Sequence, residues 1–398
     1  MIINKIINDD AYKVLQTIPD CSIDAIVTDP PYGLSKEPNI YEVLEKWMNN
    51  KEYKHPSNGF NGNEWDSFVP NPLFWKEVYR VLKPGGHLIS FSSTRTYDLL
   101  GISLRLSGFE IRDMIEWLYF NGMVKSNDIG KMFDKKDNKQ PETIGFKVEL
   151  SGRCMAIEPK AKEIKCNPDK TDRKYGVDNR TSAERKVVKI PTTDEGVKWD
   201  GWGTLLKSAH EPMVLARKPL EKVGLCENVL EYGTGALNID ECRFKEEINH
   251  DVGVYKKLNL KHSETINEKY KIHKDDQDRK FVEPLGRFPT NCITLENNEF
   301  YSEFYNITPK PLSKKPTSKD KNSNWQGDQI NLKNNHVTVK PVDLMAWLIK
   351  LITPKNGIVL DPFAGSGTTL VAAKREGFNF IGIEMDEKYA EIATERIK

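Results

Sequence analysis

The tetrapeptide Asp29-Pro30-Pro31-Tyr32 follows an apolar run over residues 23–27 and ends it abruptly. Because neither proline has a backbone N–H, the carbonyls of Asp29 and Pro30 cannot enter a following helix. The segment therefore offers a carboxylate, a free carbonyl and an aromatic ring at the edge of a predicted sheet. Two acceptors and one ring face suit a flat, amine-bearing ring. An ordinary strand-to-loop turn is the alternative interpretation, because short motifs also match by chance.

A second segment, residues 359–369, reads Val-Leu-Asp-Pro-Phe-Ala-Gly-Ser-Gly-Thr-Thr and predicts a strand, a glycine turn and a helix start. Its glycines let backbone N–H groups approach a ligand, and the helix N-terminus adds partial positive charge. A phosphate-binding loop would need a lysine after Gly367, and a dinucleotide fingerprint would need a small residue at Leu370. The segment therefore favours a nucleoside with a charged amino-acid tail, S-adenosylmethionine.

Glu384 closes the next predicted strand, one strand and helix after the glycine turn. A carboxylate at that point can accept hydrogen bonds from both ribose hydroxyls of a nucleoside. A solvated acid at a strand end is the alternative interpretation, and the placement after the glycine turn favours ribose binding.

Both motifs lie in regions where predicted strands alternate with predicted helices. The strands are expected at residues 2–7, 23–27, 87–91, 111–120, 211–217, 357–360 and 380–383. The helices are expected at residues 11–18, 72–82, 96–106, 342–352, 368–376 and 387–397. This alternation indicates an α/β fold with a mostly parallel sheet covered on both faces. Ligands of such sheets bind beyond the carboxyl ends of the strands.

The composition is that of a soluble globular protein, with 38% hydrophobic and 29% charged residues in 398. No apolar run is long enough to span a bilayer, so we expect a cytoplasmic location and no membrane partner. The net charge of +1 neither indicates nor excludes nucleic acid, because binding needs only a local basic face. The six cysteines lack zinc spacing, and no metal is expected.

In combination the two motifs resemble those of the exocyclic-amine DNA methyltransferases, which carry Asp/Asn/Ser-Pro-Pro-Tyr as catalytic motif and Phe-x-Gly-x-Gly as cofactor motif. The catalytic motif comes first in this chain, which is similar to the permuted β-group of phage or restriction-modification type. Residues 8–11, 82–86 and 336–341 resemble further segments of that family. The resemblance implies a Rossmann-like class I methyltransferase with a mostly parallel seven-stranded sheet. The permutation predicts that strand 2–7 lies beside the strand that ends at Glu384, with the two chain termini close together.

The resemblance implies transfer of a methyl group from S-adenosylmethionine to N6 of an adenine flipped out of duplex DNA. Asp29 at the first motif position looks more like the adenine-type members, and transfer to N4 of cytosine is the close alternative. A non-catalytic DNA-binding protein and an RNA or protein methyltransferase are less favoured alternatives. The implied catalytic residues are Asp29, Pro30, Pro31 and Tyr32. The implied cofactor-binding residues are Asp10, His336, Lys340, Asp361, Phe363, Ala364, Gly365, Gly367, Thr368 and Glu384.

Within the implied cofactor site, Asp10 would contact the adenine amine of the cofactor, Phe363 the adenosine face and Glu384 the ribose. His336 and Lys340 would lie on the side of the methionine carboxylate. The structural alternatives are a helix N-cap for Asp10, a core aromatic for Phe363, and a solvated loop for His336 and Lys340.

The expected domain organisation has five parts. Residues 1–124 form the catalytic half of the methyltransferase domain, 125–207 an insertion with basic residues for DNA contacts, and 208–219 a strand of the catalytic domain. Residues 220–335 form a target-recognition region, and 336–398 the S-adenosylmethionine-binding half. The implied partner is double-stranded DNA. A homodimer and a cognate restriction endonuclease are compatible with the resemblance.

Overall fold

The computed structural model describes residues 3–119 except 58, 60, 61 and 63, then 126–150, 183–243 except 223, 288–293, and 316–398 except 337. Large parts of the expected insertion and recognition region lie outside these residues. The chain divides into two compact units, Met1–Asn121 with Ala209–Lys398, and Gly122–Ser208. Within the described ranges, no helix has the length and apolar character that crossing a membrane requires.

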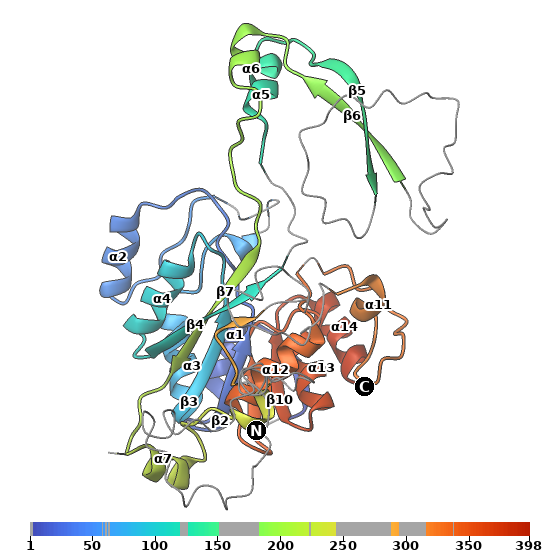
Figure 1. Cartoon of the computed structure of the whole chain (residues 1–398). Helices are drawn as coiled ribbons and strands as arrows, with labels where there is room; N and C mark the ends of the chain where they lie inside the picture. Colours follow the sequence, from blue (N-terminus) through green and yellow to red (C-terminus); the bar gives the residue numbers. More distant parts are fainter. Residues whose placement is uncertain are drawn as a thin grey trace, which may run out of the picture. The chain divides into compact units, whose positions relative to one another are not determined.

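The described residues of the first unit form an eight-stranded sheet (Figure 1). Its strand order is β1-β10-β9-β2-β3-β7-β4-β8. The bounds are β1 Lys5–Asn8, β2 Ile23–Thr28, β3 Leu82–Phe91, β4 Glu110–Leu118, β7 His210–Arg217, β8 Cys292–Ile293, β9 Ile358–Asp361 and β10 Asn379–Glu384. All pairs are parallel except those of β7, which is antiparallel to β3 and to β4. The mostly parallel α/β fold is thus confirmed, with β8 as one strand more than the seven expected.

Strand pairing confirms the arrangement expected from the permuted motif order. β1 pairs with β10, with Lys5 opposite Ile381. β2, which leads into the Asp-Pro-Pro-Tyr segment, pairs with β9, which leads into the glycine turn, and Ile26 lies opposite Leu360. The two motifs, more than three hundred residues apart in the sequence, therefore leave neighbouring strands at the same edge of the sheet.

Helices cover both faces of this sheet. One face carries α1 Ala11–Thr17, α3 Pro72–Val81 and α4 Tyr97–Leu106, and the other carries α12 Val342–Ile352, α13 Thr368–Arg375 and α14 Glu387–Ile397. Successive strand residues point to opposite faces. Accordingly, Ile26 and Leu88 pack in the core with α1 and α3, whereas Val27 and Ile89 pack in the core with α12 and α13. The described chain adds α2 Ile40–Met48, α7 Leu225–Tyr232 and α11 Ser318–Lys321.

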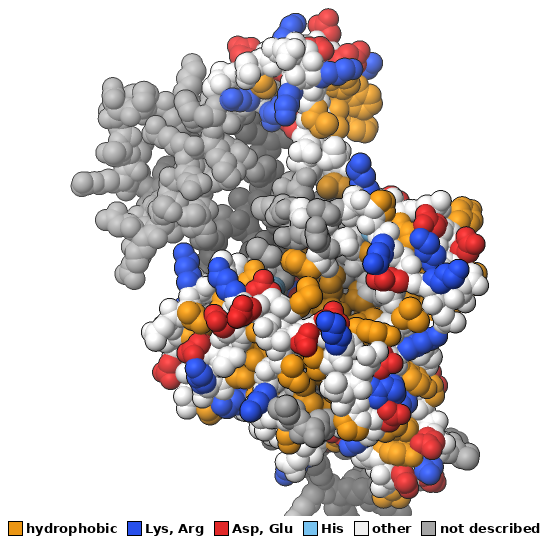
Figure 2. All heavy atoms as spheres, turned by 180° about the vertical axis from the view of Figure 1, so that it is seen from behind, with side chains coloured by type: hydrophobic (Ala, Val, Ile, Leu, Met, Phe, Trp, Pro, Cys, Tyr) orange, Lys and Arg blue, Asp and Glu red, His pale blue; other side chains and the backbone are white. Residues whose placement is uncertain are grey.

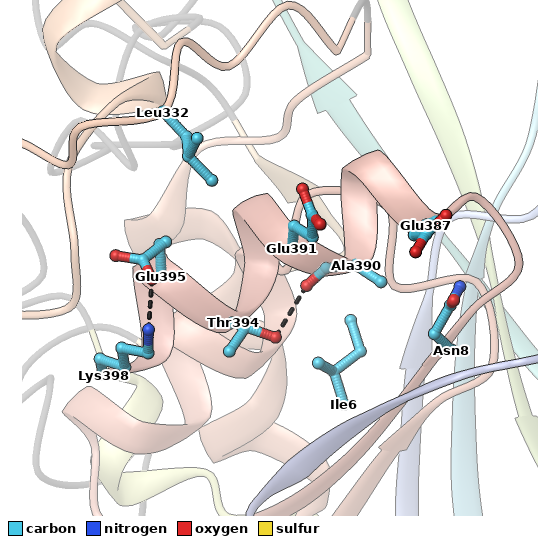
Figure 3. A pocket seen from close by; sticks show the side chains of 9 residues that line it. All are labelled: Ile6, Asn8, Leu332, Glu387, Ala390, Glu391, Thr394, Glu395 and Lys398. Carbon is cyan, nitrogen blue, oxygen red and sulfur yellow. Dashed lines mark hydrogen bonds and ion pairs between the residues drawn. The ribbon is translucent and has the colours of Figure 1, made fainter.

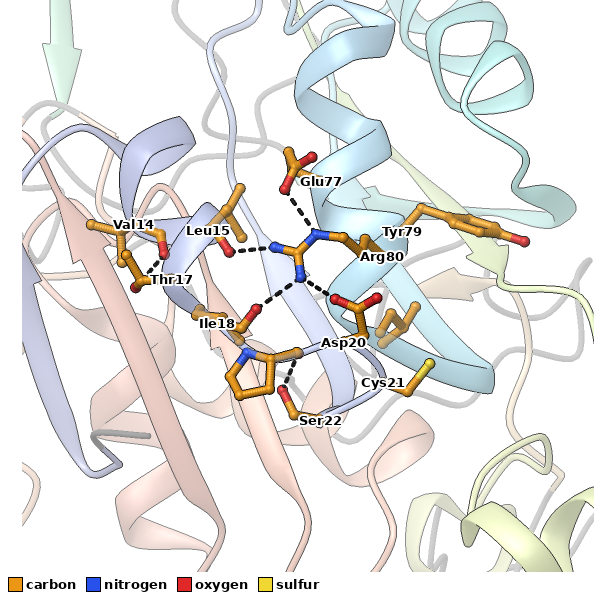
Figure 4. A network of polar contacts seen from close by, with 12 residues as sticks. Val14, Leu15, Thr17, Ile18, Asp20, Cys21, Ser22, Glu77, Tyr79 and Arg80 are labelled. Carbon is orange, nitrogen blue, oxygen red and sulfur yellow. Dashed lines mark hydrogen bonds and ion pairs between the residues drawn. The ribbon is translucent and has the colours of Figure 1, made fainter.

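The junction of α1, β2 and α3 is held by Arg80, near the end of α3 (Figure 4). Its Nη2 donates to the carbonyl of Leu15 at 2.7 Å, and its Nη1 donates to the carbonyl of Ile18 at 2.9 Å. The carbonyl of Leu15 also accepts a hydrogen bond from the N–H of Ile18 at 3.0 Å, whereas Ile18 lies at the helix end, where backbone carbonyls lack a partner within the helix. Asp20 and Glu77 hold the other edges of the guanidinium. One side chain thus fixes the end of α1 against α3, just before β2 begins.

The second unit has its own small framework. It contains α5 Ile129–Lys136, β5 Glu142–Leu150, β6 Ala183–Ile190 and α6 Asp194–Lys198, with β5 and β6 antiparallel. The buried carboxylate of Asp134 accepts hydrogen bonds from the backbone N–H groups of Thr192 and Thr193 at 2.9 and 3.0 Å. This ties α5 to the start of α6. Its role in DNA contact stays a prediction.

The first described part of the expected recognition region lies at the amino end of β3. Asn228 of α7 is buried and donates from Nδ2 to the carbonyls of Pro84 and Thr234 at 3.0 and 2.9 Å. Pro84 belongs to the beginning of β3, which is the sheet edge opposite to the end of β2. In contrast, β8 pairs with Glu116 near the end of β4. The recognition role of both segments stays a prediction.

Candidate active site

The predicted site residues line one edge of the sheet, beyond the carboxyl ends of its parallel strands. Asp10 follows β1, Glu384 ends β10, Asp361 ends β9 and Asp29 follows β2. These four strands are neighbours in that order, so the four carboxylates follow one another along the edge. The side-chain hydroxyl of Thr28 donates to Oδ1 of Asp361 at 2.7 Å and joins the ends of β2 and β9.

Asp29 has one engaged and one open carboxylate oxygen. Oδ2 accepts a hydrogen bond from the ammonium of Lys340 at 2.6 Å. Oδ1 is buried and meets no hydrogen-bond partner among the described residues. Burial raises the pKa of Asp29 above its ordinary value, and the positive charge of Lys340 opposes this rise. A buried acceptor without a donor is costly unless a ligand supplies one, which marks Oδ1 as a binding group.

The loop after Asp29 is held by its backbone as well as by its side chains. Pro30 is buried and Pro31 half-buried. The N–H of Tyr32 donates to Oδ1 of Asp66 at 2.7 Å, and the hydroxyl of Thr96 donates to the carbonyl of Tyr32 at 2.6 Å. These contacts fix the aromatic ring beside Asp29, as the sequence predicts for a stacking residue.

The hydroxyl of Tyr32 donates to Oε2 of Glu211 at 3.2 Å. Burial raises the pKa of Tyr32 well above its ordinary value, and the charges of Asp29 and Glu211 raise it further. Tyr32 is therefore a neutral hydrogen-bond donor at physiological pH. Glu211 is a site residue that the sequence analysis missed. The strand 211–217 was predicted, but only an antiparallel strand brings its first residues to this edge.

Lys340 lies in the catalytic cluster. Besides Asp29, its ammonium contacts the hydroxyl of Tyr32 at 3.1 Å and Oε2 of Glu211 at 3.3 Å. Burial lowers the pKa of Lys340, but the charges of Asp29 and Glu211 outweigh this and raise it. Its implied role near the methionine carboxylate of a cofactor stays a prediction.

The glycine turn is built against β10 and α14. Gly365 and Gly367 adopt φ values of +51° and +79°, which favour glycine. The N–H of Gly365 donates to Oε2 of Glu384 at 2.7 Å, and the N–H of Ala364 donates to the carbonyl of Ile383 at 2.9 Å. Thr368 then begins α13. The turn therefore lies directly beside the carboxylate predicted to bind a ribose.

Asp361 and Phe363 stabilise the glycine turn by hydrogen bonds and by ring packing. Asp361 is buried and accepts hydrogen bonds from the hydroxyl of Thr369 at 2.5 Å and from the N–H of Phe363 at 3.1 Å. Burial raises the pKa of Asp361 to about 6 against these hydrogen bonds. The ring of Phe363 packs on Phe74, with centroids 4.9 Å apart. Asp361 thus acts first as an internal brace of the turn.

The two remaining predicted residues also have structural partners. Asp10 is the N-cap of α1 and accepts a hydrogen bond from the N–H of Lys13 at 3.0 Å. His336 packs edge-on against Tyr389 at 4.5 Å, and a Cβ at Gly365 would lie 2.9 Å from its Nε2. Burial lowers the pKa of His336 to about 4, with a further contribution from Lys340. The imidazole is therefore neutral and contributes hydrogen bonds rather than charge.

The side chains along this edge fit a nucleoside cofactor. Glu384 and Asp10 supply carboxylates for hydroxyl and amine donors, and Phe363 supplies an aromatic ring beside the glycine turn. Burial raises the pKa of Glu384, opposed by the N–H groups of Asp386 and Gly365 that bond to it. These two N–H bonds orient the Glu384 carboxylate and leave its remaining lone pairs for a diol.

A separate cavity of about 460 Å³ lies between β1 and α14 (Figure 3). Its lining includes Ile6 and Asn8 of β1, Leu332, and the acidic side chains Glu391 and Glu395 of α14. None of the predicted catalytic or cofactor residues lines it, and its acidic wall does not suit a polyanion such as DNA. Among the described residues, no group of three or more His, Cys, Asp or Glu side chains could hold a metal ion.

Comparison with known proteins adds to this geometry. The family model described as DNA methylase, of the N6/N4 methyltransferases, matches residues 23–395. The chain is 24% identical to the Type II methyltransferase M.HindIII of Haemophilus influenzae over 419 aligned residues, which cover 100% of this chain and 96% of that protein. A 74-residue segment is 42% identical to the Type II methyltransferase M.BglI of Bacillus subtilis, covering 19% of this chain and 21% of that protein.

Among solved structures, the PvuII DNA methyltransferase, titled as cytosine-N4-specific, gives a TM-score of 0.42 at 14% identity, with 99% of this chain and 86% of that chain covered. The family match, in contrast, runs from the start of β2 to the last turn of α14 and includes both motifs. The chain therefore belongs to the N6/N4 DNA methylase family and is a DNA methyltransferase.

Proposed function

We propose that this enzyme transfers a methyl group from S-adenosylmethionine to N6 of an adenine that is flipped out of duplex DNA. The observation that supports this most directly is Oδ1 of Asp29, a buried acceptor without a partner among the described residues, beside the ring of Tyr32. An exocyclic amine supplies the missing donor, and a purine supplies a face for the ring.

The proposed chemistry begins with a weak nucleophile, because the lone pair of an aromatic amine is delocalised into its ring. Hydrogen bonds from its two N–H groups to Asp29 Oδ1 and to the carbonyl of Pro30 favour a pyramidal nitrogen with a localised lone pair. Positive charge develops on that nitrogen during the transfer, and the Asp29 carboxylate stabilises it. Tyr32 stacks on the base and holds it in a reactive orientation. This stacking offsets part of the few kcal/mol that flipping costs.

When bound, S-adenosylmethionine would supply an electrophilic methyl group and leave as a neutral thioether, and the methylated amine would pass one N–H proton to Asp29 or to water. Glu384 would accept hydrogen bonds from the ribose hydroxyls, Asp10 from the adenine amine of the cofactor, and Phe363 would contact the adenosine face. Neutral His336 would donate a hydrogen bond on the methionine side. The backbone of the turn, residues 364–368, would pass close to the cofactor.

Adenine is proposed over cytosine because Asp29 stands at the first position of the motif. Cytosine N4 presents the same two N–H groups to the same acceptors and is the alternative target. The PvuII enzyme, titled as cytosine-N4-specific, stands among the structures similar to this chain. The identity of the methylated base is therefore the first thing to measure.

DNA contacts are proposed for the second unit and for the region 220–335. Figure 2 shows Lys and Arg side chains interspersed with Asp and Glu over the described part of one face. This mixture matches the net charge of +1. We also propose a restriction-modification role in the cytoplasm, since M.HindIII and M.BglI are named as Type II methyltransferases. A partner endonuclease and a homodimer belong to that proposal.

The test expresses the chain in cells whose DNA lacks N6-methyladenine and N4-methylcytosine. Single-molecule sequencing gives the modified motif, and chromatography of the nucleosides identifies the base. We expect N6-methyladenine for the wild type and a loss of activity of about 100- to 1,000-fold for Asp29→Asn, which removes the charge and keeps the shape. Asp20→Asn, at the opposite edge of the sheet, is the matched control and should remain active.

N4-methylcytosine in place of N6-methyladenine would overturn the adenine assignment and leave the amine chemistry in place. Equal methylation by the wild type and by Asp29→Asn would overturn the catalytic role of Asp29.

A further inference from the structure

The ammonium of Lys340 bridges two largely buried carboxylates, whose side chains are 19% and 18% exposed for Asp29 and Glu211. It lies 2.6 Å from Oδ2 of Asp29 and 3.3 Å from Oε2 of Glu211, and only 6% of Lys340 is exposed. Two carboxylates and one ammonium leave one net negative charge in this cluster. Buried ions of this kind are retained only when they are paired, so the three charges depend on one another.

The ammonium of Lys340 also lies over two aromatic rings. Its Nζ lies 4.8 Å from the ring centroid of Phe91 and 5.4 Å from that of Tyr32. The next residue, Pro341, is the N-cap of α12, with φ −65° and ψ 132°. The backbone before α12 and the two rings therefore allow the ammonium little freedom. Lys340 is well suited to hold another side chain in place.

From this arrangement we infer that Lys340 and Glu211 are positioning residues for methyl transfer. Lys340 holds Asp29 by Oδ2 as an ionised carboxylate, so that Oδ1 is the free acceptor for the target amine. Glu211 holds the ammonium of Lys340 and the hydroxyl of Tyr32 with one oxygen. This inference rests on the proposed function, because it needs an amine that donates to Asp29.

Electrostatics explain why Asp29 needs such support. Burial raises the pKa of Asp29, the charge of Lys340 lowers it, and the charge of Glu211 raises it. A protonated Asp29 would donate a hydrogen bond and could not accept one from the amine. The titratable groups around the cluster are Asp29 and Tyr32 after β2, Glu211 on β7, Tyr119 after β4, Asp361 on β9, and Lys340 with His336 before α12.

The charge count makes opposite predictions for the two partners. Lys340→Met leaves two carboxylates, so Asp29 takes up a proton more easily and the acid limb of the kcat profile moves to higher pH. Glu211→Gln leaves one carboxylate and one ammonium, so the acid limb moves to lower pH. The double variant restores one net negative charge and should lie between the two. If Lys340 and Glu211 served folding alone, both variants would lose activity, but their acid limbs would not shift in opposite directions.

The experiment measures kcat and KM for methylation of DNA that carries the motif, with both substrates saturating for kcat, from about pH 5.5 to about pH 9. We expect the acid limb of Lys340→Met to rise by about one pH unit or more, the range for loss of a neighbouring opposite charge. Glu211→Gln should also be about tenfold slower on its plateau, because the common acceptor of Lys340 and Tyr32 loses its charge and holds both groups less firmly. Lys340→Arg keeps the charge and should keep the wild-type limb at a lower rate.

Lys350→Met is the matched control, because Lys350 on α12 also pairs with a glutamate, Glu376, at 3.4 Å. Its profile should equal that of the wild type. If Lys340→Met instead raises KM for S-adenosylmethionine with an unmoved kcat profile, Lys340 is a cofactor ligand and the inference is wrong. If Lys340→Met fails to fold, the downward shift of Glu211→Gln decides the question. A wild type without methyl transfer would refute the proposed function itself.

Discussion

Gly367, at the start of α13, combines two constraints that can be separated by substitution. Its φ of +79° lies in the left-handed region, and a Cβ added there would lie 2.7 Å from the Cβ of Ala393 on α14. Gly367→Ala therefore adds backbone strain and also forces α13 and α14 apart. Two other glycines of the same unit serve as comparisons, one with a positive φ alone and one with neither constraint.

The expected cost for Gly367→Ala is the sum of two terms. A residue other than glycine in the left-handed region costs roughly 1–2 kcal/mol. An extra methyl group in a packed contact costs roughly 1–3 kcal/mol. We therefore expect the free energy of unfolding to fall by about 2–5 kcal/mol, toward the upper end if α14 cannot move.

Gly377→Ala and Gly101→Ala are the matched variants. Gly377 has a φ of +80° and no atom within 4 Å of the added Cβ, so it should lose only the strain, roughly 1–2 kcal/mol. Gly101 lies inside α4 with no atom within 4 Å of the added Cβ and without a positive φ. Its alanine variant should gain roughly 0.4–1 kcal/mol, because alanine restricts the unfolded chain.

Urea titrations followed by far-ultraviolet circular dichroism give the three free energies of unfolding on one scale. The expected order of stability is Gly101→Ala above wild type, then Gly377→Ala, then Gly367→Ala. Equal losses at Gly377 and Gly367 would show that the contact with Ala393 carries no energy. A loss at Gly101 would refute the use of φ and added contacts to rank these sites.

Two further predictions concern buried polar groups. Because the pKa of Asp361 is raised to about 6 in the folded chain, the unfolded state releases its proton first, and this group lowers stability as pH rises from 3.8 to 6. Asp361→Asn removes this dependence on pH, so the free energy of unfolding of the variant relative to wild type should rise by about 1 kcal/mol between about pH 5 and about pH 8. Urea titrations at the two pH values measure this difference. A difference that does not change with pH would contradict the raised pKa. Arg80→Met leaves the carbonyl of Ile18 without its side-chain donor and the carbonyl of Leu15 with one donor instead of two, and it should cost about 1–3 kcal/mol in thermal or urea unfolding. Arg95→Met, at an arginine whose side chain is 52% exposed, is its control and should cost less than about 0.5 kcal/mol, and equal costs would refute a capping role.

The sequence predicted the parts of the fold that depend on local pattern. The helices at 342–352 and 387–397 have the bounds that were expected, because their apolar spacing and their flanking residues agree. The pairing of β1 with β10 followed from motif order alone. These features need only the chain's own periodicity and the rule that ligands bind at carboxyl ends.

The features of the fold that the sequence analysis did not predict depend on strand pairing between distant residues. The third strand was expected at residues 87–91, yet β3 begins at Leu82, which pairs with Ile23. Gly85 keeps a φ of +78° and donates its N–H to the carbonyl of Lys218. The glycine-rich segment thus becomes part of the strand through contacts with Ile23 and Lys218, which are distant in the sequence and cannot be inferred from local pattern.

The candidate site shows the same division. Asp29 and Tyr32 were predicted because they belong to one tetrapeptide, whose residue types alone indicate its chemistry. Glu211 and Lys340 reach them from far away, one on an antiparallel strand and one from the segment before α12. Strand direction and the reach of a lysine stem are tertiary properties. Glu211 was thus missed in the sequence analysis, and Lys340 was named for the cofactor side without a prediction of its contact with Asp29.

The pairing of β2 with β9 is the geometric condition for the proposed reaction. Adjacent strands lie about 4.8 Å apart, and direct methyl transfer needs the reacting atoms within about 3–3.5 Å. The hydrogen bond from Thr28 to Asp361 joins the ends of these two strands, so the segments that carry the two motifs leave the sheet side by side. The first and last strands of the described chain, β1 and β10, pair with each other on the far side of β9 from the segment Asp29–Tyr32. A permuted chain order is therefore compatible with the chemistry, because it leaves this one pair of neighbouring strands intact.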